Sequence, residues 1–173
     1  MKRALITAPL VAALAITAAG CGGSKASAPP ASTATSRTAA ADPALALKRA
    51  VRRALQQNSR LSLYTLWHNE IPAWAMQSTR GPALAELRTS ATQRRRQGIR
   101  VRHVAGQLQI LSIKLDPSYQ RATAIVRAND RFRPYHGGRA LGRTIKQNER
   151  ARVELRRVGQ AARFVVWKVV LSP

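Results

Sequence analysis

The stretch Thr144–Val158, T-I-K-Q-N-E-R-A-R-V-E-L-R-R-V, decides the fold because two kinds of residue alternate along it. Its odd positions from Ile145 to Leu155 hold most of its apolar residues, whereas its even positions up to Arg156 are all polar or charged. Successive side chains of a β-strand point to opposite faces of a sheet. This period of two therefore predicts a long strand with its odd face on a core and its even face in water.

Segments before this strand predict the rest of an antiparallel sheet. From Ile99 to Leu115 the apolar residues change phase near Leu111, which indicates a β-bulge there. Asp116–Tyr119 then predicts a turn, because Asp, Pro and Ser favour turn conformations. Arg121–Ala128 predicts the next strand.

Two features complete this half of the chain. Arg131–Gly142 is expected to form a long exposed hairpin loop, with Asp130 at the end of the strand before it. Phe164–Leu171 closes the sheet, and its inward-facing residues are expected to be Val165, Trp167 and Val169.

Helices are predicted before the sheet. Asp42-Pro43 combines a favoured N-cap residue with proline at the first helical position, and an apolar stripe at helical spacing follows as far as Leu55. Leu61–Trp74 carries aromatic residues that we expect to pack in the core. Pro82 begins another helix, which ends at Gly98 because glycine is favoured just beyond a helix C-terminus.

Helices followed by an antiparallel meander define an α+β fold, with N-terminal helices packed on a curved antiparallel sheet. This layout, ending in R-V-E-L-R-R-V-G (152–159) and F-V-V-W-K-V-V (164–170), resembles the nuclear transport factor 2-like cone fold. The resemblance covers residues 44–171. That family includes ketosteroid isomerase and many bacterial envelope proteins, and the resemblance implies a cone whose enzymes keep a carboxylate or histidine inside.

The N-terminus has the features of an export signal. Met1-Lys2-Arg3 is basic, residues 4–19 carry no charge, and small residues follow. Ala18-Ala19-Gly20-Cys21 resembles a bacterial lipobox, which implies that a diacylglycerol is attached to Cys21 after residues 1–20 are removed. The chain has no other cysteine. The alternative is ordinary secretion, with Cys21 as a free thiol.

Residues 21–41 are predicted to be the lipidated cysteine and a disordered linker, because Gly22 to Ala41 contains no large apolar residue that could offset the entropy of ordering. Residues 42–173 then form a single α+β domain. The expected location is the extracytoplasmic face of the cell membrane, with a lipid anchor in the bilayer.

The charge of the chain is strongly positive. It has 30 Lys and Arg residues and only seven Asp and Glu. A genomic codon bias explains the preference for arginine over lysine, but it does not explain the scarcity of acids. A field of this sign attracts polyanions, and the partners expected for an exported protein are anionic lipids or cell-wall polymers.

Few residues offer catalytic chemistry. Glu149 lies on the core-facing phase of its strand and His103 shares a phase with Val101, so both are candidates for a pocket wall, together with Trp67 and Trp167. The three histidines are far apart in the sequence and have no acid or cysteine at ligand spacing. We therefore predict no catalytic residue, no metal and no cofactor.

One segment, R-A-N-D-R-F-R-P-Y-H-G-G-R-A-L-G-R (127–143), interleaves basic and aromatic residues. Stacking and charge together suit an anionic glycan or single-stranded nucleic acid, although an arginine-rich hairpin would show the same pattern by chance. The candidate anion-binding residues are Arg127, Arg131, Arg133, Arg139 and Arg143.

Three hypotheses for function follow from these features. The first is a membrane-anchored cell-envelope lipoprotein with a non-catalytic, strongly basic binding or scaffold domain. The second is a small-molecule-binding or isomerase/dehydratase-like enzyme of the cone fold. The third is a binder of polyanions, either wall polymer or nucleic acid.

Overall fold

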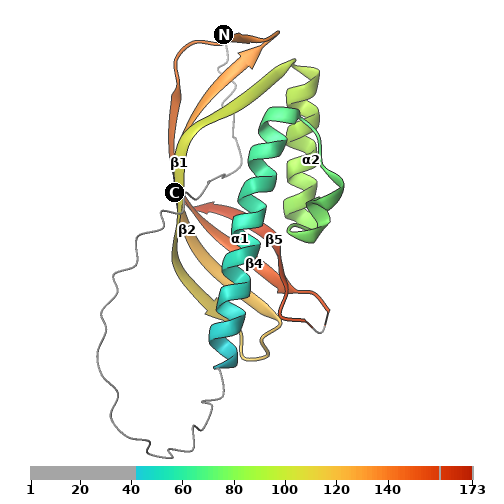
Figure 1. Ribbon diagram of the computed structural model, residues 1–173, viewed down its shortest axis with the longest axis vertical. Helices are drawn as coiled ribbons and strands as arrows, with labels where there is room; N and C mark the ends of the chain where they lie inside the picture. The colour runs from blue at the N-terminus through green and yellow to red at the C-terminus, as the bar shows by residue number, and fades with distance from the viewer. Residues whose placement is uncertain (1–41, 160, 173) are drawn as a thin grey trace, which may run out of the picture.

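The computed structural model describes residues 42–159 and 161–172, and shows two α-helices packed on one side of a curved antiparallel sheet (Figure 1). The elements are α1 (Pro43–His68), the short 3-10 helix η1 (Ala73–Gln77), α2 (Gly81–Arg96), β1 (Ile99–Leu115), β2 (Arg121–His136), β3 (Arg139–Ala140), β4 (Ile145–Arg157) and β5 (Phe164–Ser172). The predicted α+β class is confirmed. The expectations for residues 1–41, including Cys21, lie outside the described residues.

The sheet has the strand order β1-β2-β4-β5, and the two-residue β3 pairs with the end of β2. Every pair in this order is antiparallel. The long strands bend around α1, so the sheet has an inner face toward the helices and an outer face away from them (Figure 1). In the described part of the chain, no helix is long and apolar enough to cross a membrane.

The main core lies between the first half of α1 and the inner face of the sheet. Asp42 caps α1 by accepting a hydrogen bond from the Ala44 amide at 2.9 Å. Val51 of α1 then packs in one buried cluster with Val126 and Val153 of β2 and β4. Burying a side chain of this size contributes about 1.5–3 kcal/mol, so this cluster fixes the helix against the sheet.

α1 is longer than the predicted apolar stripe. Beyond Leu55 the polar side chains that interrupt the apolar stripe have hydrogen-bond partners, one in another segment and one within α1 itself. Asn58 accepts a hydrogen bond from the Thr79 hydroxyl at 2.7 Å, and the Thr65 hydroxyl donates to the Leu61 carbonyl at 2.8 Å. These satisfied polar groups interrupt the apolar pattern without ending the helix.

β2 is also longer than predicted, and the expectation of a long loop at Arg131–Gly142 is wrong. The strand runs to His136, and the connection to β4 contains only a short turn with β3. Phe132 explains the difference, since it is 4% exposed and packs with Leu66 and Val101 beneath α1. Asp130 therefore lies inside a continuous strand, not at a strand end.

Two local predictions are confirmed. The register between β1 and β2 shifts between Ile110 and Ser112, which places a bulge at Leu111. Gly98 follows α2 with a φ of 64°, a conformation that side chains disfavour and that glycine adopts freely.

The inward phase is confirmed for the second half of β4 and wrong at two other places. Ala151, Val153 and Leu155 are buried, but Ile145 at the start of β4 is exposed, although it pairs with the buried Phe132. In β5 a register shift between Glu154 and Leu155 of β4 pairs Leu155 with Val166. Val166 is therefore in the core and Trp167 is only half-buried, whereas Val165 is buried and Val169 packs against the core as predicted.

Candidate anion-binding interface

The outer face of the sheet carries many cations and one carboxylate, Glu154, which lies opposite Thr123. β2 alternates regularly from Ala122 to Phe132, so its buried even residues leave the odd residues from Arg121 to Arg133 on the outer face. β4 presents its even residues to the same side, because these pair directly with the odd residues of β2. We call this surface the basic face and define it by the exposed residues Arg102, Arg121, Arg127, Arg131, Arg133, Lys146, Arg150, Arg152 and Arg156.

Cations of the basic face lie directly opposite one another on neighbouring strands. The register gives four such pairs, which are Arg102–Arg133, Arg131–Lys146, Arg127–Arg150 and Arg121–Arg156. Directly opposed side chains in an antiparallel sheet have Cβ atoms about 4.5–5.5 Å apart, and like charges at that distance destabilise the pair. The fold therefore carries a repulsive arrangement that an anion would relieve.

Neutral amides separate two of these charged pairs. Gln107, Asn129 and Asn148 lie side by side across β1, β2 and β4, with Arg131–Lys146 on one side and Arg127–Arg150 on the other. Rows two residues apart along a strand are about 7 Å apart. A depression of about 520 Å³ lies over this amide row, and Asp130, Arg131 and Lys146 also line it.

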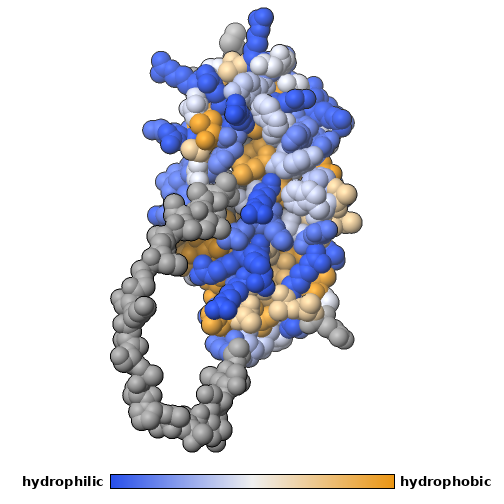
Figure 2. Space-filling view, in the orientation of Figure 1, coloured by the Kyte–Doolittle hydropathy of each residue, from blue (hydrophilic) through white to orange (hydrophobic). Residues whose placement is uncertain are grey.

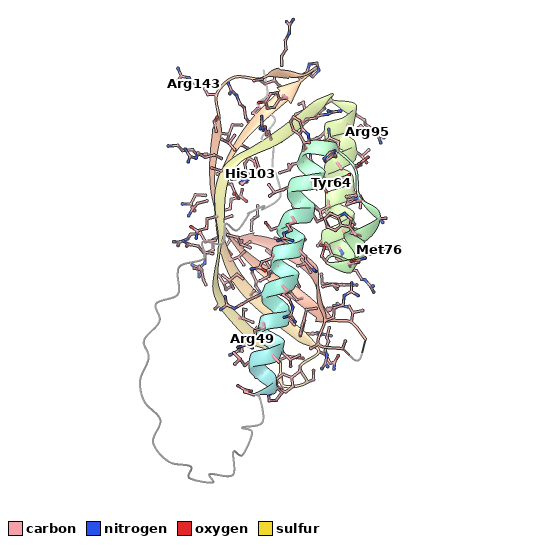
Figure 3. All side chains as sticks on the ribbon, viewed as in Figure 1. Arg49, Tyr64, Met76, Arg95, His103 and Arg143 are labelled. Carbon is pink, nitrogen blue, oxygen red and sulfur yellow. The ribbon has the colours of Figure 1, made fainter. Side chains whose placement is uncertain are left out.

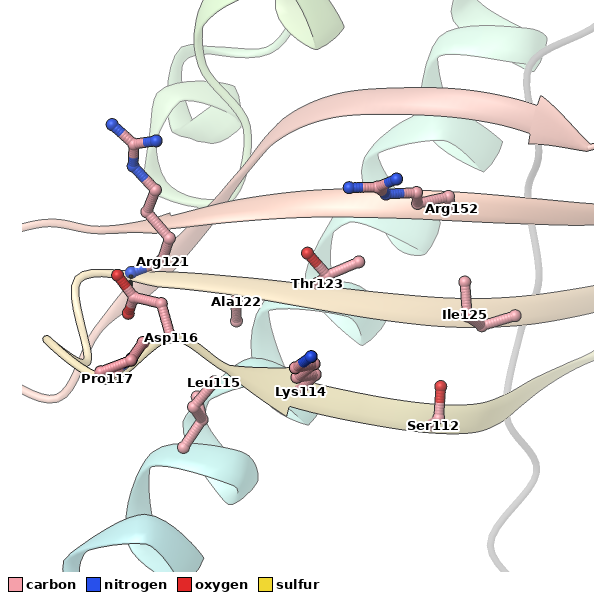
Figure 4. Close-up of a pocket in the computed structure, with 10 residues that line it drawn as sticks. All are labelled: Ser112, Lys114, Leu115, Asp116, Pro117, Arg121, Ala122, Thr123, Ile125 and Arg152. Atoms are coloured by element: carbon pink, nitrogen blue, oxygen red, sulfur yellow. Dashed lines mark hydrogen bonds between the residues drawn. The ribbon is translucent and has the colours of Figure 1, made fainter.

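A second depression, also of about 520 Å³, lies farther along the outer face near the β1–β2 turn (Figure 4). Lys114, Arg121 and Arg152 surround it, while Thr123 and Ile125 form its floor. Asp116 closes the turn beside it. That carboxylate accepts hydrogen bonds from the Ser118 hydroxyl at 2.6 Å and the Arg121 amide at 2.9 Å, and these bonds lower the pKa of Asp116.

The structure groups the predicted anion-binding residues only in part. Arg127, Arg131 and Arg133 share the basic face, whereas Arg139 lies on β3 and Arg143 in the turn before β4. Figure 3 shows Arg143 at the far tip of the molecule, and Figure 2 shows hydrophilic side chains over much of that upper part. The sequence pattern missed the partners on β4, because strand pairing brings them in from a distant segment.

The inner face holds a separate polar group made by His103, Asp130 and Glu149. His103 Nε2 lies 2.9 Å from Asp130 Oδ1, and Asp130 is 3% exposed. Figure 3 shows His103 on the part of β1 that faces α1. Glu149 accepts a hydrogen bond from Gln147 through Oε1. Within the described residues, its Oε2 is the one buried side-chain oxygen or nitrogen with no hydrogen-bond partner.

Burial raises the pKa of Asp130, and the charge of Glu149 adds to this effect while His103 opposes it. Gly106 makes the arrangement sterically feasible. A Cβ at position 106 would lie 1.8 Å from Asp130 Oδ1, so any larger residue would displace that carboxylate. The sequence contained a signal for this contact between Gly106 and Asp130. A glycine inside a strand often marks a close approach, and the even phase of β2 points Asp130 inward.

The two tryptophans predicted for the same pocket lie elsewhere. The Arg156 guanidinium lies over the Trp167 ring, 3.8 Å from its centroid, and the ring also leaves no room for a Cβ at Gly81. Trp67 lines a cavity at the end of α1 with Tyr135. Among the described residues no three His, Cys, Asp or Glu side chains could together hold a metal ion.

Comparisons with known proteins bear on the fold alone. No protein-family model matches the sequence, and no curated protein matches it. The crystal structure of the intermembrane space region of the chloroplast protein ARC6 is similar, with a TM-score of 0.60, 10% identity, and coverage of 71% of this chain and 94% of that one. At this identity the similarity supports the architecture of helices on a curved sheet.

Proposed function

We propose that this chain is a cell-envelope lipoprotein, anchored in the membrane through Cys21, whose domain is a non-catalytic binding module for an anionic cell-wall polymer. We also propose that the domain belongs to the nuclear transport factor 2-like cones, which the layout of helices and curved sheet supports. The linker then holds the basic face near the outer surface of the membrane. Tethering there raises the effective concentration of the domain next to the wall polymers.

The single observation that carries the proposal is the set of opposed cations on the outer face. Their mutual repulsion costs stability, and on the outer face of the described residues no carboxylate lies between Arg131–Lys146 and Arg127–Arg150, since Asp130 and Glu149 face inward. An anionic ligand would replace repulsion by attraction and would release counterions into solution.

The amide row favours a polymer over a lipid surface. A glycan with phosphate or carboxylate groups alternates anions with neutral hydroxyl groups, and the outer face alternates cationic pairs with Gln107, Asn129 and Asn148 in the same way. A membrane surface would use the cations and leave the amides without partners. Dependence of binding on the amides therefore distinguishes the two occupants.

Binding of heparin, used as a soluble anionic glycan, tests this proposal with the Cys21→Ser chain, which has no site for lipid attachment. Arg131→Glu should weaken binding at least tenfold and flatten its salt dependence. Asn129→Ala should weaken it several-fold. Arg88→Glu is the matched control, since it makes the same charge change on an exposed position of α2.

Two results would contradict the proposal. If Arg88→Glu weakens heparin binding as much as Arg131→Glu, net charge and not the basic face attracts the ligand. If vesicles of phosphatidylglycerol bind as tightly as heparin and Asn129→Ala changes neither, the occupant is a lipid surface.

The inner polar group supports a second candidate, a small-molecule-binding or isomerase/dehydratase-like cone. The buried and unpartnered Glu149 Oε2 is the observation that favours it, because a ligand hydroxyl could donate to that oxygen. Small ketones and alcohols should then raise the melting temperature of the native chain and leave that of Glu149→Leu unchanged. No shift with any of them would eliminate this candidate.

A further inference from the structure

The ends of both helices and the tips of β1 and β2 enclose a cavity of about 750 Å³ that is separate from the basic face. Its walls combine aromatic rings, cations and glycines. The lining residues are Trp67, His68, Asn69, Arg95, Gly98, Arg100, Tyr135, His136, Gly137 and Gly138. The lining contains no carboxylate, although it offers two guanidinium groups and two imidazoles.

Two aromatic rings form one corner of this cavity. Trp67 of α1 and Tyr135 of β2 meet edge to face, with ring centroids 5.7 Å apart and planes at 89°. Both residues are half-buried, so each supports the other and still lines the cavity. An apolar ring face beside charged groups suits a ligand that has both a C–H surface and an anionic group.

A buried cation, Arg94, lies behind the cavity wall and adds to the positive charge of Arg95 and Arg100. Arg94 of α2 is 6% exposed, and no carboxylate of the described residues lies within ion-pair distance of it. Its Nε donates to Asn69 Oδ1 at 3.1 Å and its Nη2 donates to the Thr65 carbonyl at 3.3 Å. Asn69 itself lines the cavity, so the buried charge lies one residue behind the surface.

Arg94 also offsets a local effect that would otherwise repel anions. The cavity lies at the C-terminal ends of α1 and α2, where unpaired carbonyls carry partial negative charge. The Thr65 carbonyl in the last turn of α1 accepts from both the Asn69 amide, at 3.0 Å, and Arg94. The field at the cavity is therefore set by the guanidinium groups of Arg94, Arg95 and Arg100.

Glycine shapes the remaining wall. Gly98 follows α2 with positive φ, and a Cβ there would come within 3.3 Å of the His136 ring. The absence of a side chain allows β2 to bring His136 against the end of the helix. Gly137 and Gly138 form the turn beside it, also at positive φ and with open space around them.

We infer that this cavity binds a sugar phosphate, with the pyranose ring against Trp67 and Tyr135 and the phosphate held by Arg95 and Arg100. Guanidinium groups bind phosphate oxygens through charge-assisted hydrogen bonds, and the cavity volume suits one monosaccharide unit with its phosphate. This site goes beyond the proposed function, because it uses none of the residues of the basic face.

Isothermal titration of the Cys21→Ser chain with glucose 6-phosphate tests the site. Glucose 6-phosphate should bind at least tenfold more tightly than either glucose or inorganic phosphate, because each of those lacks one half of the contacts. Arg95→Gln and Arg100→Gln should each weaken binding about tenfold. Arg96→Gln is the matched control, since Arg96 is the next residue of α2, is exposed and does not line the cavity.

The aromatic corner is tested by Trp67→Phe and Trp67→Ala. Trp67→Ala should abolish the preference for glucose 6-phosphate over phosphate, and Trp67→Phe should retain part of it even if the alanine variant folds poorly. The inference is overturned if phosphate binds as tightly as glucose 6-phosphate, if adenosine monophosphate binds more tightly, or if no probe binds. Because Arg131→Glu leaves this cavity intact, failure here and failure of the basic face are distinguishable.

Discussion

Arg127→Glu should make the protein more stable and a weaker binder at the same time. Arg127 lies opposite Gln109 on β1 and opposite Arg150 on β4. A carboxylate at position 127 would turn the repulsive pair with Arg150 into an attractive one. It would also remove one of the cations beside the amide row and place a negative charge there.

The size of the stability change follows from the geometry of the pair. Cross-strand charge pairs contribute roughly 0.2–1 kcal/mol in either direction, and exposure to solvent keeps exposed pairs at the low end of this range. Replacing repulsion by attraction should therefore raise the free energy of unfolding by about 0.5–1 kcal/mol. With a urea m-value of about 2 kcal/mol/M, the unfolding midpoint should rise by about 0.3–0.5 M.

Urea unfolding and heparin binding measured on the same preparations test both effects. The gain in stability should fall in 1 M salt, where the screening length is about 3 Å. Heparin affinity should drop at least tenfold at low salt, with a shallower dependence on salt concentration. Arg88→Glu, with the same charge change on α2, should alter each property much less.

The reasoning is refuted if Arg127→Glu lowers the unfolding midpoint, because Arg127 and Arg150 would then not repel each other in the folded protein. It is equally refuted if stability rises and heparin affinity is unchanged, since the repulsive pairs would then have no role in binding.

Four other changes have definite expected outcomes. Cys21→Ser should move the chain from the membrane fraction to the soluble fraction of the cells that export it; retention in the membrane would rule out a lipid anchor at this residue. Burial raises the pKa of Asp130, so the protonated form stabilises the fold at low pH and this contribution is lost as the pH rises through the raised pKa; Asp130→Asn should gain stability relative to the native chain over that interval in urea titrations. Asn69→Ala should lower the unfolding free energy by about 2–4 kcal/mol, because it removes bonds to Arg94 and the Ile99 carbonyl at a φ of 54°. Gly106→Ala should cost about 1–3 kcal/mol and shift the NMR resonances of His103, and unchanged resonances would contradict the contact with Asp130.

Sequence periodicity predicted those parts of the fold where one face is covered by apolar residues. The turn at Asp116, the bulge at Leu111 and the inward phase from Ala151 to Leu155 all follow from local pattern and turn chemistry. It failed where tertiary contacts decide the outcome. The strand end at Arg131–His136 forms because Phe132 packs under α1. The arginines on either side of Phe132 made this segment look like a polar loop in the sequence.

The sites were harder to predict because their parts come from different elements. His103 and Glu149 were predicted to face inward, yet their partner Asp130 was placed at a strand end. Strand register, which sets Arg127 against Arg150, is not visible in the local pattern of either segment. Trp67 and Tyr135 meet only because β1 and β2 pass over the end of α1.

The placement of the acids argues that the charge of the basic face is more than a result of composition. A genomic preference for arginine would add cations to every surface, but it would not decide where seven carboxylates lie. Asp42 caps α1, Asp116 closes a turn, Glu70 accepts from the Tyr64 hydroxyl, and Asp130 and Glu149 face inward. These five make local structural contacts. Of the other two, Glu86 is exposed on α2, and Glu154 lies on the outer face of β4 opposite Thr123 and Lys168. None of the seven is positioned in the rows of Arg131–Lys146 or Arg127–Arg150 beside the amide row. Carboxylates at those outer positions would stabilise the sheet, so the opposed cations beside the amide row support the proposal of an anionic ligand for this face.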